Sequence, residues 1–351
     1  MARPRPAADY PVEANFTTHV FKIINGVEIT LRIWPGHLKP TPQPWILYAH
    51  GGAWGFGKNQ LPNAWCIPAF RPLGYHFVSL GYRKIPQVWI EDIMEDALDA
   101  WKWCRDELPA LLPGQVDIDR YVLAGESAGG HVAMLLANRL SATAVLPPPK
   151  AVVSCYGPTD LIAGLGTGYE VLGWFPSGEF SQEELEAHIR DRNPSHAVAL
   201  CPEEFNLDVE TLREQWQDPS VVFNRRLRLQ YETTKFLTTS GRLMEALLRL
   251  DEVVCEEDRK RRAQEYSPLH SLDSTKSYPP TYFLHGTGDL VVKWETHLRP
   301  FHDKLKARGI KIGVSLADGV GHGFDNAFTV SKMNRQRALR NFTNATEMRH
   351  F

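Results

Sequence analysis

A serine between two glycines is the first candidate for chemistry in this sequence. Residues 125–129 read Gly-Glu-Ser-Ala-Gly, after a short apolar run and before apolar residues at helical spacing over 131–140. The pattern predicts a strand, a tight turn with Ser127 at its tip, and a helix, the arrangement called a nucleophile elbow. The glycines remove side chains that would collide in so tight a turn. A serine that only caps a helix in a Gly-rich turn is the alternative.

Two later residues could supply the base and the orienting acid that a serine nucleophile needs. Asp289 follows an apolar strand predicted at 281–284, and His322 follows the last predicted strand, at 310–316. Each by itself would be an ordinary loop residue. The chain order Ser, Asp, His is the one expected behind such an elbow. Together with Ser127, these residues predict a catalytic triad.

Backbone N–H groups near the serine could stabilise the oxyanion that forms when the hydroxyl attacks a carbonyl. One is the amide of Ala128, at the start of the predicted helix, where the helix dipole also favours negative charge. Gly51 and Gly52 follow the apolar strand predicted at 45–49 and let the backbone approach a substrate closely. The amide of Ala53 is an additional candidate. We therefore predict an oxyanion hole formed by Gly51, Gly52 and Ala128.

Several neighbours of these residues have weaker signals. His50 is predicted to brace the glycine turn rather than to carry protons. Glu126 is predicted to form hydrogen bonds to a nearby loop or to solvent, and an effect on the reactivity of Ser127 is the alternative. Side chains near the expected mouth of the site could line an apolar pocket, although packing in the core or in a lid is equally consistent with their types. These pocket candidates are Ala53, Trp54, Phe56, Trp174 and Phe175.

Short apolar strands alternate with helices along most of the chain, which predicts an α/β fold with a mostly parallel central sheet and helices on both faces. The chemistry-bearing turns then belong at the carboxyl ends of the strands. Asn25-Gly26 predicts a hairpin that forms an antiparallel pair at one edge of the sheet. The expected strands are 19–24, 27–34, 45–49, 76–80, 121–124, 151–156, 281–284 and 310–316. The expected core helices are 91–108, 131–140, 295–308 and 326–342.

Residues 157–277 interrupt this alternation and show helical stretches with almost no strand signal. Helices are expected at 181–192, where Ser181 and Glu184 form a capping box, and at 209–217 and 241–262. We interpret this segment as a large helical cap inserted between two strands of one sheet. The predicted domains are a core of residues 17–156 and 278–351, a cap of residues 157–277 and an N-terminal arm of residues 1–16.

Composition excludes several other classes of protein. A net charge of −2 over 351 residues argues against a general nucleic-acid or membrane-surface binder. The five cysteines are scattered and lack Cys-x-x-Cys spacing, so they predict neither a zinc site nor a disulfide framework. No secretory signal and no run of 18 apolar residues is visible. We expect a cytoplasmic protein without a membrane span, metal or organic cofactor, and make no prediction of its oligomeric state.

Four of these motifs resemble those of the α/β-hydrolase fold, specifically the hormone-sensitive-lipase-like carboxylesterase group. His-Gly-Gly at 50–52 resembles that group's His-Gly-Gly-Gly oxyanion motif, and Gly-Glu-Ser-Ala-Gly-Gly at 125–130 resembles its Gly-Asp-Ser-Ala-Gly-Gly elbow. Gly-Tyr-Arg-Lys-Ile-Pro at 81–86 is similar to its Tyr-Arg-Leu-Ala-Pro segment, and Gly-His-Gly-Phe at 321–324 to its His-Gly-Phe ending. The resemblance implies a serine esterase without a cofactor.

The resemblance covers residues 18–156 and 280–342 and leaves the predicted cap unmatched. Ala53 replaces the third glycine of the oxyanion motif, and Glu126 replaces the aspartate before the serine. The strand before Asp289 lacks the group's Asp-Pro-Leu segment. In overall style, with its large cap, the chain is similar to fungal hydrolases of polyketide pathways.

The resulting hypothesis is a serine hydrolase that cleaves a carboxylic ester of a hydrophobic small molecule through an acyl-enzyme intermediate. In an alternative, the same groups transfer an acyl chain to another acceptor, or release or cyclise a thioester-bound product in a polyketide-like pathway. A second alternative is a non-catalytic ligand receptor on a hydrolase scaffold. In each case the partner is a small molecule, an ester or thioester for the first two.

Overall fold

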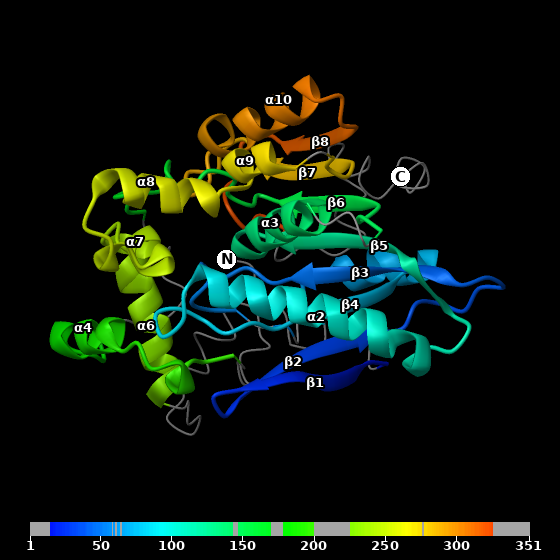
Figure 1. Cartoon of the computed structure of the whole chain (residues 1–351), viewed down its shortest axis with the longest axis horizontal. Helices are drawn as coiled ribbons and strands as arrows, with labels where there is room; N and C mark the ends of the chain where they lie inside the picture. Colours follow the sequence, from blue (N-terminus) through cyan, green and yellow to red (C-terminus); the bar gives the residue numbers. More distant parts are fainter. Residues whose placement is uncertain are drawn as a thin grey trace, which may run out of the picture.

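One eight-stranded sheet organises the protein, for which a computed structural model describes residues 15–57, 59, 62–63, 65–142, 147–169, 178–199, 225–275 and 277–325. The strand order is β1-β2-β4-β3-β5-β6-β7-β8 (Figure 1). β1 pairs with β2 and β2 with β4 in antiparallel register, and every later pair is parallel. The strands are β1 (Thr17–Ile24), β2 (Val27–Trp34), β3 (Gln43–Ala49), β4 (His76–Leu80), β5 (Val116–Glu126), β6 (Ala151–Cys155), β7 (Thr281–Gly286) and β8 (Ile312–Ala317). The predicted α/β fold and its edge hairpin are confirmed.

Both faces of the sheet are buried, as expected for parallel strands. Along β3, Trp45 and Leu47 belong to one apolar cluster, whereas Ile46 and Tyr48 belong to another on the opposite face. Helices α2 (Ile90–Leu111) and α3 (Ala128–Ala142) contribute to the first cluster, and the short helix α1 (Cys66–Phe70) to the second. Alternating side chains of a near-continuous apolar run therefore build two cores.

The structure corrects several predicted boundaries. The helix expected at 295–308 begins as a π-helical turn, Trp294–Leu298, and continues as α10 (Arg299–Ala307). Pro300, at the start of α10, lacks the N–H that a regular helix would need there. The helix expected at 241–262 is divided into α7 (Leu243–Leu248) and α8 (Glu256–Glu265), because Arg249 adopts a left-handed conformation with φ of 46°.

Other expectations in the segment 157–277 have mixed outcomes. Ser181 and Glu184 form the predicted capping box at the start of α4 (Gln182–Arg190). Helix α6 (Arg225–Thr239) was not among the predicted helices, since its face is interrupted by threonines. The helices expected at 209–217 and 326–342 lie outside the described residues, as do residues 1–14 of the predicted arm.

Four of the helices between β6 and β7, namely α4, α6, α7 and α8, lie together at one end of the sheet, away from α2, α3 and α10, which pack along its face (Figure 1). Side chains of these helices donate hydrogen bonds to main-chain carbonyls of the loops that follow β3 and β4. Gln230 Nε2 donates to the carbonyls of Gly55 (2.7 Å) and Ile85 (2.6 Å). An Arg249 nitrogen donates to the carbonyl of Gln87 at 3.0 Å. These bonds fasten α6 and α7 to the sheet domain.

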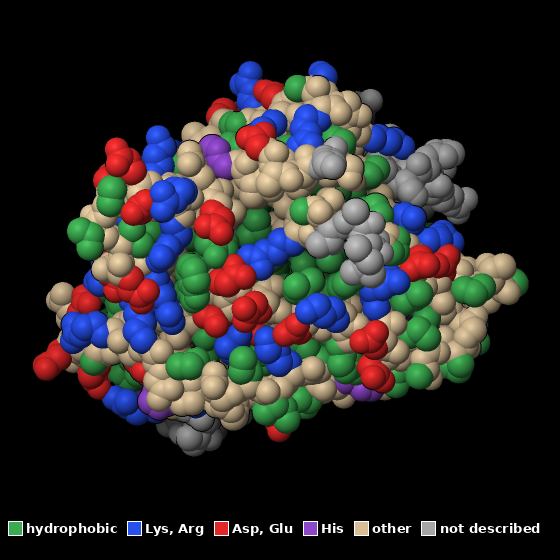
Figure 2. Space-filling model, in the orientation of Figure 1, with side chains coloured by type: hydrophobic (Ala, Val, Ile, Leu, Met, Phe, Trp, Pro, Cys, Tyr) green, Lys and Arg blue, Asp and Glu red, His purple; other side chains and the backbone are tan. Residues whose placement is uncertain are grey.

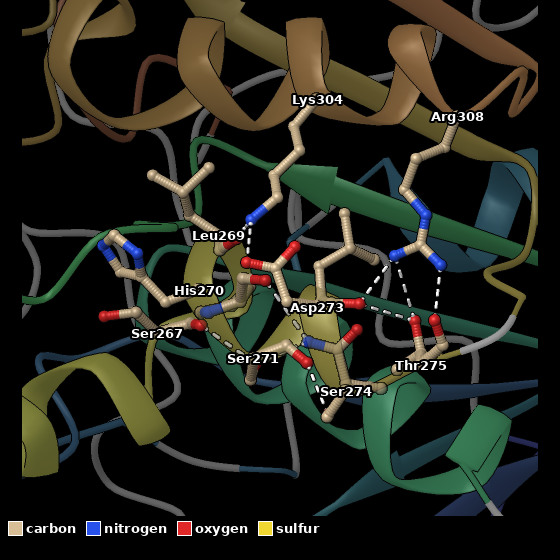
Figure 3. A network of polar contacts seen from close by, with 12 residues as sticks. Ser267, Leu269, His270, Ser271, Asp273, Ser274, Thr275, Lys304 and Arg308 are labelled. Atoms are coloured by element: carbon tan, nitrogen blue, oxygen red, sulfur yellow. Dashed lines mark hydrogen bonds and ion pairs between the residues drawn. The ribbon is translucent and has the colours of Figure 1, made fainter.

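A second set of contacts fixes the chain where it re-enters the sheet. Figure 3 shows Lys304 of α10 and Arg308, the residue directly after this helix, reaching toward α9 (Pro268–Ser271) and the turn Leu272–Ser274. Lys304 Nζ donates to the Leu269 carbonyl at 2.8 Å and to Asp273 at 2.7 Å. Arg308 donates to the Leu272 carbonyl at 2.6 Å and to Thr275. The approach to β7, the strand that precedes Asp289, is therefore held against α10.

The face of the molecule seen in Figure 2 carries basic and acidic side chains intermixed, with no broad field of one sign. Within the described ranges, no helix is long and apolar enough to cross a membrane. Among the same residues, no group of three or more histidine, cysteine, aspartate or glutamate side chains is arranged to hold a metal ion.

Candidate active site

Ser127 lies in the turn between β5 and α3, in a left-handed backbone conformation with φ of 49°. Its own N–H donates to the carbonyl of Cys155 at 2.8 Å, which ties the turn to the end of β6. A Cβ atom at Gly129 would lie 2.0 Å from the backbone oxygen of Ala49, and one at Gly125 would lie 2.3 Å from the oxygen of Gly129. The turn thus requires both glycines, for the steric reason inferred from the sequence.

The ends of β7 and β8 bring two further side chains to Ser127. His322 Nε2 lies 2.8 Å from Ser127 Oγ, and His322 Nδ1 lies 2.7 Å from Asp289 Oδ2. The other carboxylate oxygen of Asp289 accepts the N–H groups of Val291 and Val292, both at 2.9 Å. The three predicted triad residues are therefore joined by hydrogen bonds in the order that proton transfer would need.

The carboxylate of Asp289 is suited, as an anion, to hold the imidazole of His322 in place. Burial would raise the pKa of its carboxyl, but the hydrogen bond and charge of His322 and the Val292 amide outweigh that cost and lower the pKa below its usual value. Because a carboxylate accepts hydrogen bonds only, His322 carries its proton on Nδ1 and presents Nε2 to the serine. His285, buried 3.7 Å from Asp289, has a pKa lowered to about 4 by burial, so it is neutral near pH 7.

A buried carboxylate that was not predicted supports the loop of His322. Asp325 is fully buried and accepts hydrogen bonds from Asn63 Nδ2 (2.9 Å), Trp65 Nε1 (2.8 Å) and the Tyr156 hydroxyl (2.5 Å). The ring of Tyr156 in turn contacts the His322 ring edge-on, with centroids 4.8 Å apart. Asp325 stands three residues after His322, so its position in the sequence could have drawn attention to it, although its partners could not be foreseen.

The amide of Gly51, a predicted oxyanion donor, has a different partner in the structure. It donates to Glu126 Oε1 at 2.9 Å, so this N–H is occupied. The amides of Gly52, Ala53 and Ala128 donate to no other described residue. Gly52 and Ala53 both adopt left-handed conformations, with φ of 111° and 52°. The amide of Ala53, only an additional candidate from the sequence, is thus open, whereas that of Gly51 is engaged.

Glu126 and His50 both contact Gly51, in the loop that follows β3. Burial, with a smaller contribution from the charge of Asp325, raises the pKa of Glu126 to about 8, while the Gly51 N–H acts in the opposite direction. His50 Nδ1 lies 2.7 Å from the Gly51 carbonyl, and its ring stacks on Tyr82 with centroids 4.3 Å apart. These contacts agree with the bracing roles inferred for both residues.

A small cavity opens beside Ser127. Its volume, measured as the space open to the centre of a water molecule, is about 50 Å³. Of the predicted pocket residues, Ala53 and Trp54 line it; Phe56 instead packs edge-on against Tyr231, and Trp174 and Phe175 lie outside the described residues. Most of the wall was missed, because it comes from separate segments without a common spacing: Pro158, Asp160, Leu161, Ala163, Gly164, Thr167, Tyr169, Leu243, Met244, Val291, Val292 and His297.

Comparison with known proteins shows the same fold. Residues 46–170 match a family model described as the alpha/beta hydrolase fold. The chain has the α/β-hydrolase fold. It is also similar over nearly its whole length to solved esterases. Esterase 2 of Thermogutta terrifontis, phosphoramylated by tabun, aligns with a TM-score of 0.57 at 19% identity over 97% of each chain. An α/β hydrolase superfamily protein of Enterococcus faecalis gives 0.58 at 20% identity over 95% of this chain and 97% of that one.

Curated relatives support the resemblance inferred from the motifs, including its polyketide aspect. The α/β hydrolase is 28% identical over 298 residues to the non-reducing polyketide synthase Preu3 of Preussia isomera, covering 81% of this chain and 11% of that protein. It is 33% identical over 140 residues to an ethyl acetate hydrolase of Pseudomonas putida, covering 37% of this chain and 43% of that protein. The chain therefore spans only about a tenth of the synthase and less than half of the hydrolase.

Proposed function

We propose that this α/β hydrolase is a serine esterase that acts through an acyl-enzyme. The observation that carries the proposal is the continuous hydrogen-bonded chain from Ser127 Oγ through His322 to Asp289, with both links below 2.9 Å. His322 Nε2 takes the hydroxyl proton as Ser127 Oγ bonds to the ester carbonyl carbon, and Asp289 stabilises the imidazolium. His322 then protonates the departing alcohol, and the same steps with water release the acid.

The tetrahedral intermediates carry negative charge on the former carbonyl oxygen. We assign its stabilisation to the backbone N–H groups of Ala128, Gly52 and Ala53, which are free of other described acceptors. Gly51 is left out of this set because its amide is bonded to Glu126. Ala128 begins α3, so the positive end of the helix dipole adds to its N–H.

A carboxylic ester of a small, largely apolar molecule is the substrate class that fits best. The cavity beside Ser127 is formed mainly by apolar side chains, and its volume corresponds to about three to five water molecules. The similarity to an ethyl acetate hydrolase supports short esters. We also retain residues 157–277 as the proposed cap. The free thiols of the four described cysteines support a cytoplasmic location.

A second candidate is acyl transfer or thioester release, as in the alternative drawn from the sequence. The similarity to a segment of non-reducing polyketide synthases favours it. Both candidates share the acyl-enzyme and differ in what attacks it. Product analysis with an ester and a thioester of the same acid, with and without an alcohol acceptor, separates them: free acid as the product supports hydrolysis, and a new ester supports transfer.

The test of the shared mechanism is covalent labelling by a fluorophosphonate probe, combined with a panel of p-nitrophenyl esters of increasing chain length. We expect the wild type to be labelled at Ser127, and Ser127→Ala to lose labelling and at least about 10³-fold in kcat/KM. Absence of labelling in a folded wild type would support the non-catalytic receptor and contradict the proposal.

A further inference from the structure

Two ionisable side chains in the wall of the cavity have no part in the proposed mechanism. Asp160 follows β6, and His297 lies in the π-helical turn Trp294–Leu298. Both side chains line the cavity beside Ser127, among mainly apolar neighbours. Polar groups placed in an apolar pocket usually fix the orientation of a ligand.

His297 has hydrogen-bonding capacity that the described protein does not use. The residue is only 7% exposed, and no hydrogen bond joins either ring nitrogen to another described residue. His297 lines the same cavity as Asp160 and Ser127, so its ring lies near the proposed reaction site. Burial lowers the pKa of His297, which keeps the ring neutral near pH 7 with one donor and one acceptor. Buried polar groups are normally paired, so this imidazole calls for a polar partner in the cavity.

Asp160 has one oxygen engaged and one open. Its Oδ1 accepts the N–H of Ile162 at 3.0 Å and lies 3.3 Å from His270 Nε2. No hydrogen bond joins Oδ2 to another described residue, and the side chain is 18% exposed. The first oxygen therefore shapes the turn after β6, and the second is available as an acceptor.

We propose that Asp160 and His297 recognise a hydroxyl group on the acyl part of the substrate, which makes esters or thioesters of short hydroxy acids the preferred class. The hydroxyl donates to Asp160 and accepts the His297 N–H. The acyl part is assigned to the cavity because it stays bonded to Ser127 while the alcohol leaves. Room for about three to five water-sized groups suits a chain of about four heavy atoms. The inference rests on the proposed esterase function.

The test compares ethyl butyrate with ethyl 3-hydroxybutyrate, which differ by one hydroxyl. We expect wild-type kcat/KM to be at least about tenfold higher for the hydroxy ester, because the acyl chain of ethyl butyrate offers no hydrogen-bond partner to Asp160 and His297. In Asp160→Asn and in His297→Phe the ratio between the two esters should fall at least about fivefold. Asp160→Asn keeps an oxygen for the Ile162 amide, so the turn is preserved. A wild-type ratio near one, or a ratio unchanged in both variants, overturns the proposal.

Thr167→Val is the matched control. It removes a hydroxyl from the wall of the same cavity, but this hydroxyl already donates to the Ala163 carbonyl. Its ratio between the two esters should equal that of the wild type, and an equal fall in this variant would contradict a specific role for Asp160 and His297. Near-UV circular dichroism checks that each variant is folded; if one is not, the other variant and the wild-type ratio decide.

Failure of the inference can be told from failure of the esterase function. Hydrolysis of ethyl butyrate and fluorophosphonate labelling of Ser127, without preference for the hydroxy ester, would overturn only the hydroxyl recognition. Loss of both labelling and turnover would overturn the esterase function, and the inference with it.

Discussion

Replacing Asp325 with alanine should both destabilise the protein and slow the reaction of Ser127. The variant removes the carboxylate that accepts hydrogen bonds from Asn63, Trp65 and Tyr156. A hydrogen bond to a charged group contributes about 1.5–3 kcal/mol. The sum of three is an upper bound, because these bonds are not additive and removal of a buried charge recovers part of its desolvation cost. We expect the free energy of unfolding to fall by about 3–4 kcal/mol.

Two measurements on this variant separate the effect on stability from the effect on the site. Urea denaturation gives the free energy of unfolding, and fluorophosphonate labelling at a temperature where the variant is folded gives the rate at Ser127. We expect labelling to slow at least about tenfold, because the loop of His322 loses its anchor. Asp325→Asn keeps one acceptor oxygen and should be intermediate. Tyr156→Phe removes the bond to Asp325 and the longer bond that the hydroxyl accepts from Asn63, and should cost about 1–2 kcal/mol.

The reasoning would be refuted if Asp325→Ala unfolded within about 1 kcal/mol of the wild type and was labelled at the wild-type rate. A large loss of stability with unchanged labelling of the folded variant would show that Asp325 supports the fold without positioning His322.

Three further predictions concern a pKa, a glycine and a buried ion pair. Burial raises the pKa of Glu126 to about 8 from 4.5, so the native state binds this proton more tightly than the unfolded chain, and stability is lost as pH rises between those values. When urea denaturation at pH 5 and at pH 8.5 is compared, Glu126→Gln should lose at least ~2 kcal/mol less of its free energy of unfolding than the wild type. An equal loss would contradict the raised pKa. Gly129→Ala should yield insoluble protein or lose more than about 3 kcal/mol in thermal unfolding, whereas Gly321→Ala, whose Cβ would meet nothing closer than 3.9 Å, should not. Asp96→Asn should cost about 3–5 kcal/mol, because the buried Arg83 guanidinium loses the carboxylate that it contacts at 2.9 Å; a cost below 1 kcal/mol in chemical denaturation would contradict this.

The strands along the chain, their mostly parallel pairing and the proximity of Ser127, Asp289 and His322 could be predicted, because all three follow from local patterns. Each candidate stands just after a short apolar run, and parallel strands place such positions at one edge of the sheet. The turn after β5 also brings Gly125 and Gly129 close to Ala49 at the end of β3, an approach without room for a side chain that the Gly-x-Ser-x-Gly spacing already implies.

What could not be predicted depends on contacts between distant segments. The engagement of the Gly51 amide requires the Glu126 side chain to reach across from a neighbouring strand, 75 residues away in the chain. Division of the predicted helix 241–262 depends on a left-handed Arg249, a conformation that residue type does not indicate. The cavity wall combines loops after β6 and β7 with α7, so no periodicity in any one of them marks it.

In each hydrogen bond described above between α6 or α7 and the sheet domain, only the partner from the helical segment is a side chain. Gln230 and Arg249 contribute side chains, whereas Gly55, Ile85 and Gln87 contribute only main-chain carbonyls, which any residue type provides. Substitutions in the two loops therefore leave these acceptors in place if the backbone path is kept, except at Gly55, where a Cβ atom would lie 2.4 Å from Thr234 Oγ1 of α6. A helical segment transplanted onto a related sheet domain would bring its own donors. The helices that contribute to the cavity wall and the sheet domain that carries Ser127 are thus free to diversify separately.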